Sequence, residues 1–245
     1  MDSGFYAASA GLRAQSQALE VAAHNLANLN TAGFRGQQAS FQTLLAIARP
    51  AVPNALNLAI NNFGVLEGTH LDLGPGSLQD TGNPLDVGIE GNGFFAIQTP
   101  QGTRYTRNGS FRVARSGELV TATGNPVLGE SGAIRVPAGT VSISSDGTLS
   151  VNSAVAGKIR LVEFAPETKL TSEGAARLSA PSGSELRARQ TSVRQGVLES
   201  SNVNAISAVM TLIGVQREAE MMQRALSLFH TEFNRIAAND LPRVS

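Results

Sequence analysis

The amino-acid sequence predicts an α+β protein. Long N- and C-terminal helices are expected to pair as a coiled-coil-like domain, and a central antiparallel β-rich domain is expected between them in the chain. Apolar residues recur at heptad spacing near the start of the chain and again near its end. Between these two stretches, short β-prone runs alternate with glycine-containing turn sequences.

The first helix is expected at about residues 3–29, with Asp2 or Ser3 as its cap. At 1.5 Å per residue it would be roughly 40 Å long. The apolar seam is narrow and includes the polar residue Gln15, so the helix needs a partner helix to cover it. The main seam positions hold Phe5, Leu12, Leu19 and Leu26, and the companion positions hold Ala8, Ala22 and Leu29.

The partner helix is expected at about residues 205–238, with Asn202 or Asn204 as its cap. A pair of ordinary core helices is the alternative, and it is disfavoured because the mean globular helix has only about 11–12 residues. The apolar positions alternate in steps of three and four, which is the heptad pattern. They are Leu212, Val215, Ala219, Met222, Leu226, Phe229, Phe233 and Ile236.

The middle of the chain is predicted to form an antiparallel β domain. Turns are expected at Gly91-Asn92-Gly93, Asn108-Gly109, Ser116-Gly117 and Asp146-Gly147, and the Asn-Gly pair is the strongest hairpin signal among them. The expected strands are Leu85–Ile89, Phe94–Gln98, Arg104–Thr106, Ser110–Val113, Glu118–Thr121, Ala133–Val136, Thr140–Ile143, Thr148–Val151 and Lys158–Phe164.

These elements divide the chain into four parts. Residues 1–30 hold the N-terminal helix of a terminal helical domain, and residues 196–245 hold its C-terminal segment and helix. Residues 80–195 form the central β domain, and residues 31–79 form a connector. Prolines and an asparagine-rich run in the connector argue against one continuous helix there.

Composition excludes several classes of function. The chain has 19 basic and 19 acidic residues, so it lacks the positive field of a nucleic-acid-binding protein. It has no cysteine, which excludes disulfides, thiol catalysis and thiolate metal sites. No apolar run approaches the roughly 20 residues of a spanning helix, so direct membrane insertion is not expected. The N-terminus lacks the pattern of a general secretory signal peptide, so the protein either stays in the cytoplasm or leaves by another route.

Motifs for catalysis or for cofactor binding are not found. Residues 88–93 have the order GxxGxG and precede a β-prone run, so a hairpin turn is expected rather than a dinucleotide loop. The three histidines, His24, His70 and His230, are scattered; a pH switch or metal pair is a less favoured reading than solvated or interface side chains. We therefore predict no enzyme activity, no catalytic residue, no cofactor and no metal site.

Several motifs resemble those of the bacterial flagellar axial proteins, which are the rod, hook and hook-associated subunits. Residues 23–35, AHNLANLNTAGFR, are similar to the N-terminal signature of this family, with His24 where asparagine is usual. Residues 76–87, 91–95, 105–111 and 195–204 follow in the family's order. The motif residues are Asn25, Leu26, Ala27, Asn28, Thr31, Gly33, Phe34, Ser201, Asn202, Val203 and Asn204.

The resemblance implies a structural subunit of the flagellar basal-body rod. Such subunits leave the cytoplasm through the flagellar type III export apparatus and polymerise in the periplasm into a hollow helical rod that transmits motor torque to the hook. The implied partners are copies of the chain, other rod subunits and the export apparatus. The assembly interface is expected on the helical seams, at Phe5, Leu12, Leu19, Leu26, Leu212, Val215, Met222, Leu226, Phe229, Phe233 and Ile236.

Alternatives remain open at this point. Within the family, the chain looks most like the F-type subunit of the proximal rod, with the G-type distal-rod subunit and the hook subunit as alternatives. From a different class, a coiled-coil oligomer that is not exported and that carries a β binding module fits the same pattern. Growth with rising concentration distinguishes these classes, because a head-to-tail interface that does not close produces a filament.

Overall fold

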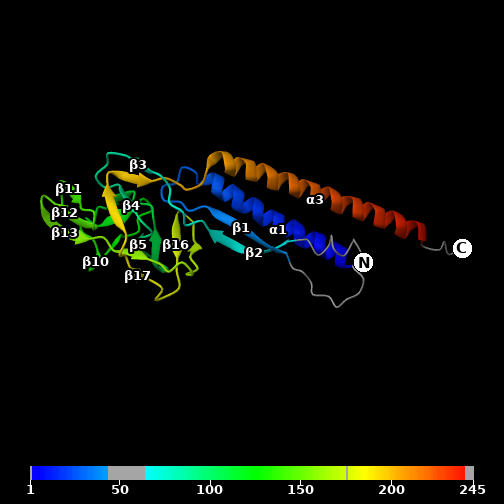
Figure 1. Ribbon diagram of the computed structural model, residues 1–245, viewed down its shortest axis with the longest axis horizontal. Helices are drawn as coiled ribbons and strands as arrows, with labels where there is room; N and C mark the ends of the chain where they lie inside the picture. Colours follow the sequence, from blue (N-terminus) through cyan, green and yellow to red (C-terminus); the bar gives the residue numbers. More distant parts are fainter. Residues whose placement is uncertain (1, 44–63, 175, 241–245) are drawn as a thin grey trace. The chain divides into compact units, whose positions relative to one another are not determined.

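The computed structural model describes residues 2–43, 64–174 and 176–240 (Figure 1). The chain forms two compact units. The helical unit contains residues 1–26, 37–70 and 205–245, and the β unit contains residues 27–36 and 71–204. The β unit thus includes residues 27–36 and 196–204, which the sequence-based division placed outside its central β domain. The division of the chain at residues 80 and 195 stays a prediction.

The helical unit holds α1 (Asp2–Ala27), α3 (Ala205–Asp240) and a two-stranded sheet of β1 (Gln37–Thr43) and β2 (Gly64–Leu71). Both helices lie within two residues of their predicted bounds. Neither contains proline, so no backbone hydrogen bond is lost along their length. The two strands lie within the predicted connector, where no strand was expected.

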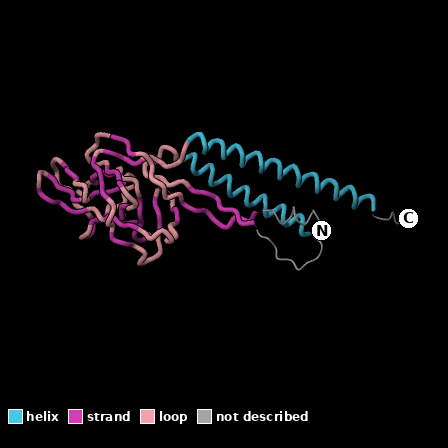
Figure 2. Tube along the Cα trace, in the orientation of Figure 1, coloured by secondary structure: helices cyan, strands magenta, loops and turns pink. Residues whose placement is uncertain are grey.

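The two helices lie side by side and run in opposite directions (Figures 1 and 2). Gln15 of α1 donates hydrogen bonds through Nε2 to the Val215 carbonyl oxygen at 3.0 Å and to Glu218 Oε2 at 2.8 Å. The polar member of the first predicted seam therefore contacts the second seam. A coiled-coil geometry with regular interlocking of both seams stays a prediction.

Burial along the helices differs from the simple seam. On α1 the buried side chains are the small ones, Ala14, Ala18 and Ala22, whereas the predicted seam leucines Leu12, Leu19 and Leu26 are half-buried. On α3 the described seam residues Leu212, Val215, Ala219 and Met222 are half-buried. The side chains of Phe5, Leu226, Phe229, Phe233 and Ile236 lie outside the described part of the structure.

The β unit is built from short strands around two apolar clusters. The larger cluster includes Phe95, Ile97, Leu119 and Leu149, each at most 1% exposed, and Phe95 meets Phe111 edge-on at 5.0 Å between ring centres. The strands are β3 (Leu78–Asp80), β4 (Val87–Glu90), β5 (Phe94–Thr99), β6 (Gly102–Thr106), β7 (Phe111–Val113), β8 (Leu119–Thr121), β9 (Leu128–Gly129), β10 (Gly132–Ala133), β11 (Val141–Ile143), β12 (Thr148–Val151), β13 (Ala154–Lys158), β14 (Leu161–Glu163), β15 (Thr171–Ser172), β16 (Arg177–Ser179), β17 (Leu186–Arg187), β18 (Ser192–Gln195) and β19 (Val197–Glu199).

The pairing of these strands is antiparallel throughout the described registers. The largest sheet has six strands in the order β15-β16-β6-β5-β14-β17. Strands from the start of the unit's sequence pair with strands from its end: β4 pairs with β18, and β3 pairs with β19. The C-terminal strands therefore complete the sheet pairs that the first strands begin.

Two predicted hairpins are wrong. Asn108-Gly109 lies between β6 and β7, but β6 pairs with β5 and β16, and β7 pairs with β8. A side chain at Gly109 would lie 1.7 Å from the Val87 carbonyl oxygen, so this glycine permits close packing instead of a hairpin turn. Residues 91–93 likewise join β4 and β5, which pair with other strands. The turns at Ser116-Gly117 and Asp146-Gly147 do connect paired strands.

Candidate functional site: a buried junction of the motif residues

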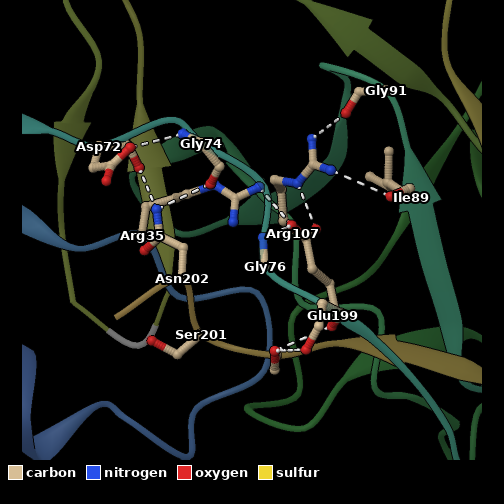
Figure 3. Close-up of polar contacts among 12 residues, drawn as sticks. Arg35, Asp72, Gly74, Gly76, Ile89, Gly91, Arg107, Glu199, Ser201 and Asn202 are labelled. Carbon is tan, nitrogen blue, oxygen red and sulfur yellow. Dashed lines mark hydrogen bonds and ion pairs between the residues drawn. The ribbon is translucent and has the colours of Figure 1, made fainter. Parts of the chain in front are cut away.

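Segments from the two ends of the β unit meet in one place, where Figure 3 shows Arg35, Glu199, Ser201 and Asn202. Segment 27–36 enters the unit from α1, segment 71–77 returns to it from β2, and segment 199–204 leaves it toward α3. We call the meeting point of these three segments the junction. It lies wholly within the β unit.

The first segment reaches the junction through a tight turn after α1. Thr31 donates from its backbone N to the Asn28 carbonyl oxygen and from Oγ1 to Asn28 Oδ1, at 3.2 and 3.1 Å. Gly33 then takes a φ of +66°, and an added Cβ there would lie 2.3 Å from the Asn108 backbone nitrogen. Phe34 is 2% exposed. This turn, formed by Thr31 and Gly33, leads the chain from α1 to Phe34 in the core of the β unit.

An ionic cluster lies at the centre of the junction. Glu199 accepts from Arg35 Nη2 at 2.7 Å through Oε1 and from Arg107 Nε at 2.6 Å through Oε2. The three side chains are at most 3% exposed. Oε1 also accepts from the Gly76 backbone nitrogen at 2.8 Å. The buried carboxylate of Glu199, in the last segment, therefore contacts the other two segments of the junction and also Arg107, which follows β6.

Arg107 anchors this cluster to the body of the β unit. Its Nη1 donates to the carbonyl oxygens of Gly91 and Gly93, and its Nη2 donates to that of Ile89, at 2.7–3.2 Å. The guanidinium also lies over the Phe94 ring, 5.7 Å from its centre. Burial lowers the pKa of Arg107, and the charge of Arg35 lowers it further, whereas Glu199 opposes both effects. The carboxylate thus keeps two like charges together in a dry environment.

Arg35 is less fully satisfied than Arg107. Within the described part of the chain, its buried Nε and Nη1 have no hydrogen-bond partner. The ion pair with Glu199 is therefore the main interaction that offsets the desolvation cost of burying Arg35.

Asn202 forms a second link at the junction. Its Oδ1 accepts from the Gly36 backbone nitrogen at 2.8 Å, and its Nδ2 donates to the carbonyl oxygens of Asp72 and Gly74, both at 2.9 Å. Its own backbone nitrogen donates to the Phe34 carbonyl oxygen at 3.4 Å. One side-chain amide therefore binds the backbones of the other two segments.

The remaining motif residues lie beside this core of contacts. Asn25, in the helical unit, exchanges two hydrogen bonds with the backbone of Gln37, at 2.7 and 2.8 Å. Ser201 Oγ accepts from the Val203 backbone nitrogen at 3.2 Å. Leu26 is half-buried, whereas Ala27 and Asn204 are exposed.

Sequence reasoning missed the ionic cluster. Arg35, Arg107 and Glu199 each lie in a quoted motif, but none was predicted as a site residue. The signal was local: Glu199 occupies the inward position of β19 together with Val197, which is 1% exposed. A charge at an inward strand position requires a buried partner.

The comparisons with known proteins agree with the motif order. Three family models match successive regions: Flagella basal body rod protein at residues 5–35, Flagellar hook protein FlgE/F/G D1 domain at residues 88–151, and Flagellar basal body rod FlgEFG protein C-terminal at residues 194–230. The flagellar basal-body rod protein FlgF of Escherichia coli K12 is 37% identical over 246 residues, covering 93% of this chain and 94% of that protein. This chain belongs to the flagellar basal-body rod family.

Other rod proteins match over similar lengths. FlgF of Salmonella typhimurium is 35% identical, with 93% of this chain and 94% of that protein covered. FlgG of Borreliella burgdorferi is 32% identical over 265 residues, with 97% and 98% covered. Each arm of the ionic cluster falls in a different matched region: Arg35 in the first, Arg107 in the second and Glu199 in the third.

The arrangement is structural in its chemistry. The charged groups of Arg35, Arg107 and Glu199 are paired and closed to solvent, so this cluster presents no group to a substrate. Across the described ranges, no group of three or more metal-ligating side chains comes together. No described helix is long and apolar enough to cross a membrane.

Proposed function

We propose that this chain is a structural subunit of the flagellar rod that polymerises through its helical unit with copies of itself and with other rod subunits. Membership of the rod family supports the structural role. The observation that carries the assembly step is a set of large apolar side chains exposed on α3.

These side chains lie away from the predicted seam. Ile206, Met210 and Ile213 follow one another at steps of four and three, which places them on one face of the helix. They are 73%, 68% and 45% exposed, and Met221 further along is 62% exposed. Exposed apolar side chains gathered on one helix face are what a protein–protein interaction surface requires, and they support this assignment. We call this set the outer face of α3.

The outer face and the seam divide the work of assembly in this proposal. The half-buried seam residues Leu212, Val215 and Met222 contribute to the helix pair within one chain, and the outer face contributes to contacts between chains. Leu12, Leu19 and Leu26 act on the α1 side of the pair. Together with Phe5, Leu226, Phe229, Phe233 and Ile236, these six residues remain predicted assembly residues.

The test introduces one negative charge on the outer face. Met210→Asp should raise the concentration at which the purified chain associates by at least tenfold, measured by sedimentation velocity and electron microscopy. Gln216→Asp is the matched control, because it adds the same charge to the same helix at an exposed polar position. If both variants associate as the parent does, the outer face is not an assembly surface.

The same experiment distinguishes the rival class. A closed oligomer stops growing at a fixed size, whereas a rod subunit continues to grow as the concentration rises. The F-type assignment is supported by relatives named FlgF at 37% and 35% identity, compared with 32% for a relative named FlgG. Passage through the type III export apparatus, location in the periplasm and transmission of torque belong to the proposal as well.

A further inference from the structure

The chain crosses between its two units four times, and every crossing borders the junction. The crossings lie at 26/27, 36/37, 70/71 and 204/205. The first two enclose segment 27–36, the third precedes segment 71–77, and the fourth follows segment 199–204. Any force that passes from one unit to the other along the chain therefore enters the β unit through these three segments.

The first and last segments are bonded directly to each other. The Gly33 backbone nitrogen donates to the Glu199 carbonyl oxygen at 2.7 Å, and the Arg35–Glu199 ion pair lies beside this bond. Asn202 adds the bonds to Phe34 and Gly36 described above. Two backbone contacts and two contacts that involve a side chain thus join the first segment to the last. Arg35 and Glu199, which form one of them, are 164 residues apart in the chain.

The middle segment is bonded to both of the others. The Asp72 backbone nitrogen donates to the Gly36 carbonyl oxygen at 2.8 Å. The Ser200 backbone nitrogen donates to the Ser77 carbonyl oxygen at 2.8 Å, and the Gly76 nitrogen binds the Glu199 carboxylate. All four crossings are therefore held together where they reach the β unit, before the chain enters the apolar clusters.

We propose that the junction is a mechanical clamp. A pull on the two ends of the chain is carried across the contacts between segments 27–36 and 199–204, and the sheets between them bear load only after these contacts break. Burial of the ion pair suits this role, because water cannot compete for its hydrogen bonds until the pair opens. The clamp goes beyond rod assembly, since it operates within one chain.

The test is single-molecule force spectroscopy on the full chain. The protein has no cysteine, so one cysteine added at each end provides unique attachment points. Rupture of the clamp should release the 164 positions between Arg35 and Glu199 in one event, a gain of roughly 540–590 Å at about 3.3–3.6 Å per residue. Helix extension is expected as a separate event at lower force.

Arg35→Met is the decisive variant. It removes the ion pair, which is one of the four contacts between the first and last segments, and leaves the Arg107–Glu199 pair balanced in charge. The lifetime of the closed β unit under constant force should fall at least tenfold, and segment 27–36 should detach in a smaller step before the main event. Arg104→Met is the matched control, because it breaks the Arg104–Glu173 pair in the same unit but away from the junction.

Asn202→Ala provides a second measurement with a milder change. It removes the side-chain bonds to Gly36, Asp72 and Gly74 and should also shorten the lifetime under force, by at least threefold. An unchanged lifetime in both junction variants would overturn the clamp. So would a parent protein whose β unit unfolds in several small steps from its ends.

Discussion

Replacement of Glu199 by glutamine tests how strongly the buried cluster stabilises the β unit. The change removes the carboxylate that Arg35 and Arg107 share, and both guanidinium groups, at 2% and 3% exposure, then remain buried without a counter-charge. Breaking a buried ion pair by removing one partner costs about 3–5 kcal/mol. Because whole domains are stable by only about 5–15 kcal/mol, the variant should lose a large share of its free energy of unfolding.

Hydrogen exchange in a urea series provides the assay. Peptides from β5 and β6 report the opening free energy of the β unit separately from that of the helices. Glu173→Gln is the control, since its pair with Arg104 is exposed to solvent and should contribute much less to stability than the buried cluster.

A double variant sharpens this prediction. Arg35→Met combined with Glu199→Gln leaves one uncompensated buried charge instead of two, so it should be more stable than Glu199→Gln alone. A loss below about 1 kcal/mol for the single variant would refute the reasoning. A double variant less stable than the single one would refute it as well.

Two further predictions concern the backbone and the pH dependence. Gly33→Ala should lower the free energy of unfolding, measured in urea, clearly more than Gly183→Ala. Both glycines have positive φ, where any side chain costs about 1–2 kcal/mol, but of the two only Gly33 would place its Cβ against a backbone. Equal losses in the two variants would contradict this reasoning. The Glu163 carboxylate accepts from the Thr191 hydroxyl and from the backbone nitrogens of Gln190 and Arg189, and these bonds, the hydroxyl first, lower its pKa. The stabilisation by the Glu163 carboxylate is therefore present above its unfolded pKa of about 4.3 and is lost as the pH falls through the lower folded pKa. In calorimetry, Glu163→Gln should therefore make the fall in Tm below about pH 4.3 less steep. An unchanged slope would contradict this prediction.

The sequence by itself determined the helices and much of the strand content. Heptad spacing and the absence of proline are local properties, and the predicted helices at 3–29 and 205–238 became Asp2–Ala27 and Ala205–Asp240. The strand around Phe94–Gln98 was likewise visible as an apolar, β-prone run. The family motifs were legible for the same reason, since each is a short continuous stretch.

Tertiary structure alone decided which of these pieces meet. Strand pairing is a relation between distant segments, so a local turn signal at Asn108-Gly109 predicted a hairpin that the sheet does not contain. The pairs β4–β18 and β3–β19 carry no local signal at all. The same holds for Glu199, which lies 164 positions from Arg35 and 92 from Arg107. A buried charge selects its partner by proximity in the folded core, and spacing along the chain does not encode that proximity.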